Sequence, residues 1–234
     1  MHLVIFDIDG TLTHTSDVDA ACFVRAVADV AGLTGIGSHW TDYTQVTDAG
    51  ILGQIFERQL GRLPSADESA RVRRHFVSLL DAAFRDAPAA FAEVPGAGLA
   101  VRTLQAEGEW VLALASGAWR ASALFKLEKA GIDAARLPGA FADDAPGRPD
   151  IVRIAATRAR QHYGHSFTRT VCVGDAVWDV RTAALLGLPF LGVALDRRAA
   201  ALREHGASHV LPDFTDLDRV RDALRAARVP DDSR

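Results

Sequence analysis

The sequence predicts an α/β fold, in which a doubly wound, Rossmann-like parallel sheet forms the core and a helical cap domain is inserted into it. Short apolar runs alternate with longer stretches of helical periodicity over most of the chain. This alternation is typical of a parallel sheet with helices on both faces. Residues from about 16 to 92 break the rhythm. A chain of 234 residues that is 49% hydrophobic is long enough for such a core and a smaller second domain.

The core strands are predicted from continuous apolar runs, beginning with LVIF at residues 3–6. Runs of this length are typical of strands that are buried on both faces. Further strands are expected at WVLALA (110–115), TVCVG (170–174), FLGVAL (190–195) and HVL (209–211), and another at GAFADD (139–144). Helical patterns lie between the strands, at 98–108, 119–131, 150–164, 177–187 and 217–227, and several end at a glycine, as helices often do.

The segment 16–92 has helical periodicity and no convincing strand. Its first helix is expected to begin near Ser16 or Asp17, either of which can cap it. Further helical patterns follow in AGILGQIFERQLG and ADESARVRRHFVSLLDAAF. The alternating pattern resumes at AEVPGAG (92–98). We therefore expect residues 1–15 and 93–234 to form the α/β core, and residues 16–92 to form a helical cap domain inserted after the first strand.

The composition argues against a nucleic-acid-binding protein, a membrane protein and a secreted protein. The formal net charge of −4 gives no basis for binding nucleic acid or an anionic membrane, and no apolar run approaches the length of a membrane helix. The run at 3–6 is also too short for a signal-peptide core. Cys22 and Cys172 each sit in an apolar stretch, so both are expected to be reduced core residues of a cytoplasmic protein. Nothing in the sequence demands more than a monomer.

Polar residues follow the predicted strands at the point where each strand ends. Because the carboxyl ends of parallel strands meet at one edge of a sheet, α/β proteins form their sites there. The edge would collect Asp7, Asp9, Thr11, Ser116, Gly117, Arg148, Asp175 and Asp179. Clustered carboxylates repel one another unless a cation lies among them, and hard oxygen donors favour Mg²⁺. A metal ion, a cationic side chain and a hydroxyl group are together the groups that an enzyme needs to bind a phosphoryl group and to neutralise its charge during transfer.

The same residues resemble the motifs of the haloacid dehalogenase superfamily. DIDGT (7–11), Ser116-Gly117, a cation in a later loop and GDAVWD (174–179) occur in the order of that family's motifs, each after a predicted strand. The insertion between the first two motifs matches as well, and the resemblance covers essentially the whole chain. It implies Mg²⁺-dependent hydrolysis of a phosphate monoester through an aspartyl-phosphate. It also implies that the helical cap closes over the site and selects a small phosphorylated metabolite.

The resemblance implies a role for each acid. Asp7 would be the nucleophile, and Asp9 would protonate the leaving oxygen and then take a proton from the hydrolytic water. Mg²⁺ would be held by Asp7, the backbone carbonyl of Asp9, and Asp175. Asp179 would orient these ligands or a metal-bound water, and Thr11 would steady the first loop beside the phosphate. From the residues alone, Asp175 could instead be a helix N-cap and Asp179 a first-turn acid favoured by the helix dipole.

The phosphate would be bound by Ser116-Gly117 and by Arg148. Here the chain departs from the family pattern, because most relatives carry lysine in the third motif. The only lysines, Lys126 and Lys129, lie on the helix after Ser116, outside the expected loop. Arginine stays charged and grips phosphate with a planar fork. Arg148 can therefore replace the lysine, with Arg120, at the start of the helix after Ser116, as the rival cation.

Substrate selection is expected to fall to the cap. The candidates are Thr15, Asp17 and Asp19 at its entry and the stretch WTDYTQVTD (40–48) in its middle. Among them we expect Asp17, Thr47 and Asp48 to contact the substrate. The alternative for Thr47 and Asp48 is that they cap the helix that follows them.

Other activities of the superfamily compete with a phosphatase. A phosphomutase would use the same Asp7, Asp9 and Asp175, so the motifs do not separate the two. A catalytically impaired phosphate-binding protein is a further alternative, because of Arg148. Carbon–halogen hydrolysis needs no metal and typically lacks the second aspartate, so Asp9 and Asp175 argue against it. A phosphonate-cleaving enzyme would want a lysine in the cap, and residues 16–92 contain none.

Overall fold

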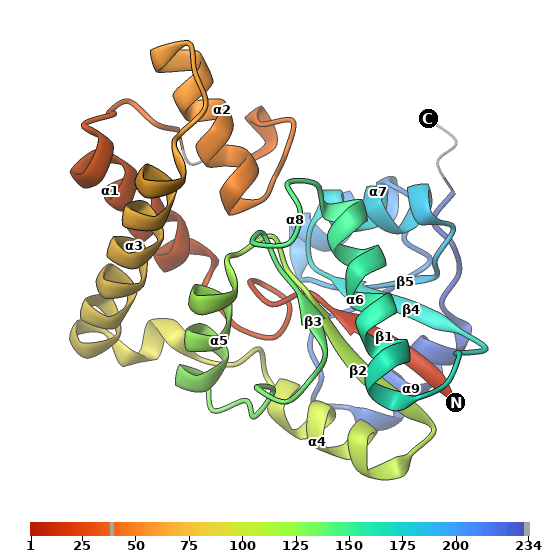
Figure 1. Ribbon diagram of the computed structural model, residues 1–234. Helices are drawn as coiled ribbons and strands as arrows, with labels where there is room; N and C mark the ends of the chain where they lie inside the picture. Colours follow the sequence, from red (N-terminus) through yellow and green to blue (C-terminus); the bar gives the residue numbers. More distant parts are fainter. Residues whose placement is uncertain (38–39, 232–234) are drawn as a thin grey trace.

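The computed structural model describes residues 1–37 and 40–231. Figure 1 shows a sheet with helices on both faces and, to one side of it, the separate helices α1, α2 and α3. In the described part of the chain the sheet has six strands in the order β3-β2-β1-β4-β5-β6, all parallel. They are β1 (His2–Phe6), β2 (Trp110–Ala115), β3 (Gly139–Ala140), β4 (Thr170–Gly174), β5 (Phe190–Val193) and β6 (His209–Leu211). The predicted doubly wound α/β fold is therefore confirmed.

The central strand β1 places the first motif at the point where the strand order reverses. The chain runs outward from β1 through β2 to β3, then returns to β4 on the other side of β1. Phe6, the last residue of β1, pairs with Leu114 of β2 and with Val173 of β4. The carboxyl ends of these three strands therefore lie side by side at the reversal, where open α/β sheets form their sites.

The two faces of the sheet are covered by different helices. Val4 and Phe6 of β1 belong to a core that includes α4 (Ala97–Glu107) and α9 (Leu217–Ala226). Leu3 and Ile5 point to the opposite face, into a core with α6 (Arg148–Tyr163), α7 (Val177–Leu186) and α8 (Asp196–Glu204). Successive residues of β1 point to opposite faces of the sheet, and each face is covered by an apolar core. This explains why β1 appears in the sequence as an unbroken apolar run.

The inserted helices have a hydrophobic core of their own. They are α1 (Ser16–Ala31), α2 (Asp48–Leu60) and α3 (Ala66–Asp86), with the short helices η1 (Trp40–Asp42) and η2 (Pro88–Phe91). Ser65 and Glu68 form a capping box at the start of α3. Phe23, Phe56 and Phe76 pack in this core together with Trp119, which precedes α5 (Arg120–Lys129). The Phe23 and Trp119 rings stack 5.7 Å apart and join the insert to the sheet domain.

The structure departs from the predicted elements in two places. Helix α8 was not expected, because only Ala199 and Leu202 of its nine residues are buried, which is too few to show a helical period. The strand expected at 139–144 is short, because only Gly139 and Ala140 pair with β2. Both cysteines are buried and unpaired, as predicted. Among the described residues, no helix is long and apolar enough to cross a membrane.

Candidate active site

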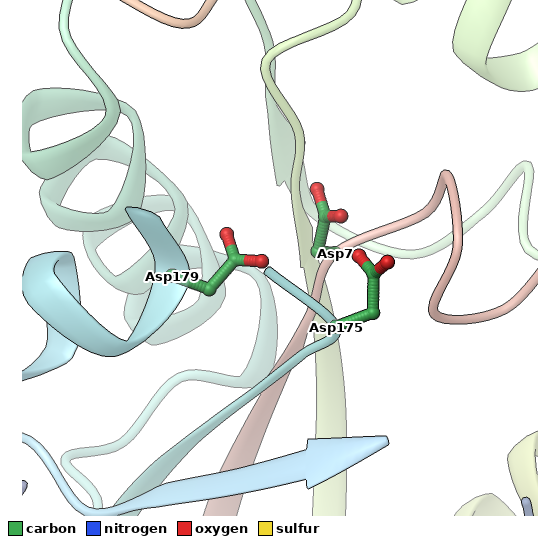
Figure 2. A group of neighbouring side chains, drawn as sticks. All are labelled: Asp7, Asp175 and Asp179. Carbon is green, nitrogen blue, oxygen red and sulfur yellow. The ribbon is translucent and has the colours of Figure 1, made fainter. Parts of the chain in front are cut away.

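Three carboxylates converge at the carboxyl edge of the sheet. Asp7 directly follows β1 and Asp175 directly follows β4, while Asp179 lies in the first turn of α7. Figure 2 shows the three side chains pointing toward one another. One oxygen from each lies within 4.8 Å of the others, and all three residues are buried. The predicted meeting of the first and last motifs is therefore present.

The third-motif cation reaches this cluster. Arg148 is the first residue of α6, and its Nη2 donates to Asp7 Oδ1 at 2.9 Å and to Asp179 Oδ1 at 2.7 Å. Its side chain is 11% exposed. Arg120, the rival cation, is exposed and stacks on the Phe141 ring 5.3 Å away. The geometry therefore favours Arg148 as the cation of the site.

Two glycines make the close approach of these groups possible. Gly10 has a φ of +84°, and a Cβ there would lie 2.1 Å from Asp175 Oδ2. A Cβ at Gly117 would lie 2.5 Å from Arg148 Nη1. Both positions exclude a side chain, because such separations are far inside van der Waals contact. The glycines of the first and second motifs thus let the acids and Arg148 pack together.

Burial and mutual repulsion make the acids difficult to ionise. The pKa of Asp7 is raised well above its usual value by burial, against the pull of Arg148 and with the help of Asp179. Burial raises the pKa of Asp175 to about 7, and Asp179 adds to this while Arg198 and Arg148 oppose it. With all three acids ionised, the cluster would hold more negative charge than Arg148 balances.

This excess charge fits a divalent metal ion. Asp7, Asp175 and Asp179 present carboxylate oxygens close together, and such hard donors are those that Mg²⁺ prefers. Asp179 has its oxygens engaged by Arg148 and by the Ala176 backbone N–H at 3.1 Å. That arrangement suits the predicted orienting role, with Asp7 and Asp175 as the carboxylate ligands.

The two predicted hydroxyls have different surroundings. Ser116 directly follows β2, accepts the Ala118 backbone N–H at 3.1 Å and lines the cavity beside Asp7. Thr11 is fully buried and its Oγ1 has no hydrogen-bond partner within the described structure. The loop it belongs to is closed by backbone bonds instead, from Gly10 N–H to the Thr13 carbonyl at 2.7 Å and from Thr13 N–H to the Ile8 carbonyl at 3.0 Å.

Asp9 has an unexpected partner. Lys126 Nζ donates to Asp9 Oδ2 at 2.6 Å and also contacts Asp19 of α1, and its side chain is completely buried. Thr15 Oγ1 donates to Asp9 Oδ1 at 2.6 Å. Lys126 was expected to lie outside the site, because it belongs to a helix and not to a loop that follows a strand. The available signal was its position on α5, in line with buried Ser122 and Ala123, whereas Lys129 is partly exposed.

The cap residues expected at the substrate lie elsewhere. Asp17 is exposed in the first turn of α1. Thr47 caps α2 by accepting the Gly50 N–H at 3.0 Å, and its hydroxyl donates to the Pro146 carbonyl at 2.7 Å. Asp48 Oδ2 accepts the Trp119 N–H at 2.8 Å. Thr47 and Asp48 thus dock the insert onto the core, which agrees with the capping alternative for Thr47.

A cavity of about 310 Å³ opens between the insert and the sheet edge. The core contributes Asp7, Asp9, Ser116, Arg148, Asp175 and Trp178 to its lining, and the insert contributes Ser16, Asp19, Trp40, Thr41 and Val46. Of these insert residues, Asp19 and those from the stretch 40–48 were among the predicted candidates, and Ser16 adjoins the predicted Asp17. They come from the start of α1 and from the stretch 40–46.

A parallel sheet with this strand order, an inserted helical unit and two aspartates, Asp7 and Asp9, directly after the first strand define a class of hydrolases. The chain belongs to the haloacid dehalogenase-like hydrolases, whose family model matches residues 1–187. The resemblance found in the motifs is therefore confirmed.

Individual relatives extend over nearly the whole chain. A phosphoglycolate phosphatase of Cereibacter sphaeroides is 29% identical over 241 aligned residues, covering 95% of this chain and 97% of that protein. A hydrolase from Pseudomonas syringae matches in structure with a TM-score of 0.71 at 21% identity, covering 96% and 99%. CbbY from Rhodobacter sphaeroides, solved in complex with phosphate, matches with a TM-score of 0.65 at 20% identity, covering 92% and 95%. At these identities the structural matches show the shared fold.

Proposed function

We propose that the protein is a Mg²⁺-dependent phosphatase that hydrolyses a small phosphate monoester through a phosphoryl group on Asp7. The observation that carries the proposal is the buried Asp7 carboxylate at the end of β1, held by Arg148 and facing Asp175. Asp9 lies two residues along the chain and lines the same cavity. A nucleophile, a proton-transfer group and a cation thus share one enclosed site.

The residues divide the reaction into two displacements. A carboxylate oxygen of Asp7 attacks phosphorus, the bond to the leaving oxygen breaks, and Asp9 gives that oxygen a proton. Water then attacks phosphorus, Asp9 takes its proton, and the bond to Asp7 breaks to release phosphate. Arg148 holds Asp7 in place and, with Ser116, Gly117 and the Thr11 loop, would balance and orient the phosphate oxygens.

The proposed metal site uses Asp7, Asp175 and the backbone carbonyl of Asp9, with Asp179 orienting the ligands. When bound, Mg²⁺ supplies positive charge to offset the acids and the phosphate. This assignment is supported by the convergence of the three carboxylates and by the raised pKa of Asp175.

The proposed substrate is a small phosphorylated metabolite, because the cavity of about 310 Å³ encloses only a small molecule. Phosphoglycolate is the first candidate, since the Cereibacter sphaeroides relative carries that name. We further propose that residues 16–92 act as the cap domain that encloses it, and that residues 1–15 and 93–234 act as the catalytic core. The contacts of Thr47 and Asp48 with the core support a cap seated over the site.

The test is phosphate release from p-nitrophenyl phosphate and phosphoglycolate, with and without Mg²⁺, by the wild type and by Asp7→Asn. The proposal predicts Mg²⁺-dependent release that the substitution abolishes. Analysis of the products separates a phosphatase, which frees inorganic phosphate, from a phosphomutase, which returns it to a sugar. Mg²⁺ and phosphate binding without turnover of any phosphate monoester would instead indicate an impaired phosphate-binding protein.

A further inference from the structure

We infer that Lys126 is a positioning residue, which fixes the carboxylate of Asp9 for proton transfer and ties it to the insert through Asp19. The inference rests on the proposed function, in which Asp9 protonates the leaving oxygen. It adds a residue from outside the four motifs to the machinery of the site.

The carboxylate of Asp9 is held through both of its oxygens. Lys126 Nζ donates to Oδ2 at 2.6 Å and Thr15 Oγ1 donates to Oδ1 at 2.6 Å. Thr15 is itself fixed, because its hydroxyl lies 2.6 Å from the Thr13 hydroxyl. Two short bonds that reach a carboxylate on different oxygens leave it little freedom to rotate. The orientation of Asp9 is therefore set by its neighbours.

Lys126 acts through Asp9, because it does not itself line the cavity. Its side chain has no exposed surface, and the lining includes Asp9 and Asp19 but not Lys126. A buried ammonium is costly unless its partners compensate, and an apolar side chain of similar size would fill the same space at lower cost. A lysine at this helix position is thus better explained by its two carboxylate partners than by packing.

The contact also joins three segments that are distant in sequence. Lys126 belongs to α5 of the core, Asp9 to the loop after β1, and Asp19 to α1 of the insert. Thr15 is the residue that precedes α1. The proton-transfer group is therefore positioned jointly by the core and by the first turns of the insert. Movement of the insert would therefore change the orientation of the Asp9 carboxylate.

The test exploits the fact that a good leaving group needs no proton. The substrates are aryl phosphates of similar shape whose leaving phenols differ in acidity: p-nitrophenyl, phenyl and p-methoxyphenyl phosphate. The quantity measured is kcat/KM, which reports the steps up to release of the phenol and not the later hydrolysis of the aspartyl-phosphate. A correctly placed general acid contributes about 10²–10⁴-fold to such a step.

We expect Lys126→Met to lower kcat/KM for phenyl phosphate at least about tenfold more than for p-nitrophenyl phosphate, because only phenol needs the proton from Asp9. Adding Lys126→Met to an Asp9→Asn variant should not change the ratio between the two substrates further. Lys129→Met is the matched control. Lys129 lies on the same helix, pairs with Glu128 and stacks over Phe84, so its loss should leave the ratio unchanged.

Equal losses on the phenyl and p-nitrophenyl substrates would overturn the inference, because they would show a general structural role. Additive effects of Lys126→Met and Asp9→Asn on the ratio would overturn it as well. If Lys126→Met does not fold, Lys126→Gln, whose uncharged amide is one bond shorter than the ammonium and so withdraws from Asp9, is judged by the same criteria. A wild type that releases no phosphate from the aryl phosphates or from phosphoglycolate would refute the proposed function itself, and this inference with it.

Discussion

One guanidinium nitrogen of Arg148 donates hydrogen bonds to two carboxylates. Its Nη2 lies 2.9 Å from Asp7 Oδ1 and 2.7 Å from Asp179 Oδ1. Burial opposes its charge, but the surrounding acids more than compensate and raise its pKa. The third-motif arginine therefore stays charged in the site, and its rigid fork holds the proposed nucleophile in a fixed direction.

We expect Arg148→Lys to reduce kcat about tenfold and Arg148→Met to reduce it about 10²-fold or more, because an ammonium keeps the charge but cannot reproduce the fork. Phosphate release from p-nitrophenyl phosphate measures both. Arg120→Met is the control, since Arg120 lies on Phe141 and away from the acids. If Arg148→Met kept wild-type kcat, Arg148 would have no part in the reaction.

Asp175 should make Mg²⁺ binding depend on pH. Burial and the nearby Asp179 and Asp9 raise its pKa to about 7, against the opposing effect of Arg198 and Arg148. Below that pH the carboxyl holds a proton, which must leave before the metal binds. Metal binding therefore weakens as the pH falls.

We expect the Kd for Mg²⁺ to rise about tenfold between pH 8 and pH 6, with one proton released per ion at the lower pH. Calorimetric titration in two buffers of different ionisation enthalpy measures both quantities. Asp175→Asn should bind more weakly and lose this pH dependence. A Kd that is the same at both values would show that Asp175 does not ligate the metal.

At the scale of the residue, the sequence located the groups that follow strands and missed those that arrive from helices. Asp7, Ser116 and Asp175 were predictable because each directly follows a buried strand of a parallel sheet. Lys126 was not, because its approach to Asp9 depends on how α5 packs over the first loop. The spacing places Lys126 on the same face of α5 as Ser122 and Ala123, but it does not show which loop that face contacts.

Among the secondary-structure elements, the start of α2 is one of the links between insert and core. Asp48 N–H donates to the Gly117 carbonyl at 2.7 Å, and Asp48 Oδ2 accepts the Trp119 N–H at 2.8 Å. Arg73 of α3 adds an ion pair with Asp143 at 2.8 Å. The N-terminal end of α2, which is capped by Thr47, thus docks on the loop that carries Ser116 and Gly117.

We expect Asp48→Ala to lower the free energy of unfolding by about 1–3 kcal/mol, because it leaves the buried Trp119 N–H without an acceptor. Asp48→Asn should cost less, since the amide oxygen can still accept, and burial already disfavours the charged carboxylate by raising its pKa. Urea denaturation measures both. Asp17→Ala, an exposed change on α1, should stay within about 0.5 kcal/mol of wild type. An Asp48→Ala variant as stable as the Asp17→Ala control would contradict this view of α2.

The strands were more predictable than the insert. Strands buried on both faces appear in the sequence as continuous apolar runs, so β1, β2 and β4 lie where they were expected. Helix α8 escaped because its buried face consists of only Ala199 and Leu202. In the insert, the helices were recognisable from their period, but the residues that face the acids depend on the angle at which those helices meet the core.

At the scale of the whole molecule, a cavity lies between the sheet domain and the inserted helices. The insert has its own aromatic core around Phe23, Phe56 and Phe76, and Trp119 extends that core to the loop that carries Ser116. The sheet fixes the acids, and the insert supplies the opposite wall of the cavity. We therefore propose that the sheet domain carries out the chemistry and that the insert selects the substrate, which is why the sequence motifs report mainly on the chemistry.

The central claim is that Asp7 carries the phosphoryl group during turnover. The most direct test is to quench the Asp9→Asn variant with acid during reaction with p-nitrophenyl phosphate and Mg²⁺, and to map the peptides by mass spectrometry. That substrate needs no proton for its leaving group, whereas hydrolysis of the intermediate needs Asp9, so the intermediate should accumulate. The account predicts one added phosphoryl group on the peptide that contains Asp7. Release of p-nitrophenol with no phosphoryl group on that peptide would contradict it.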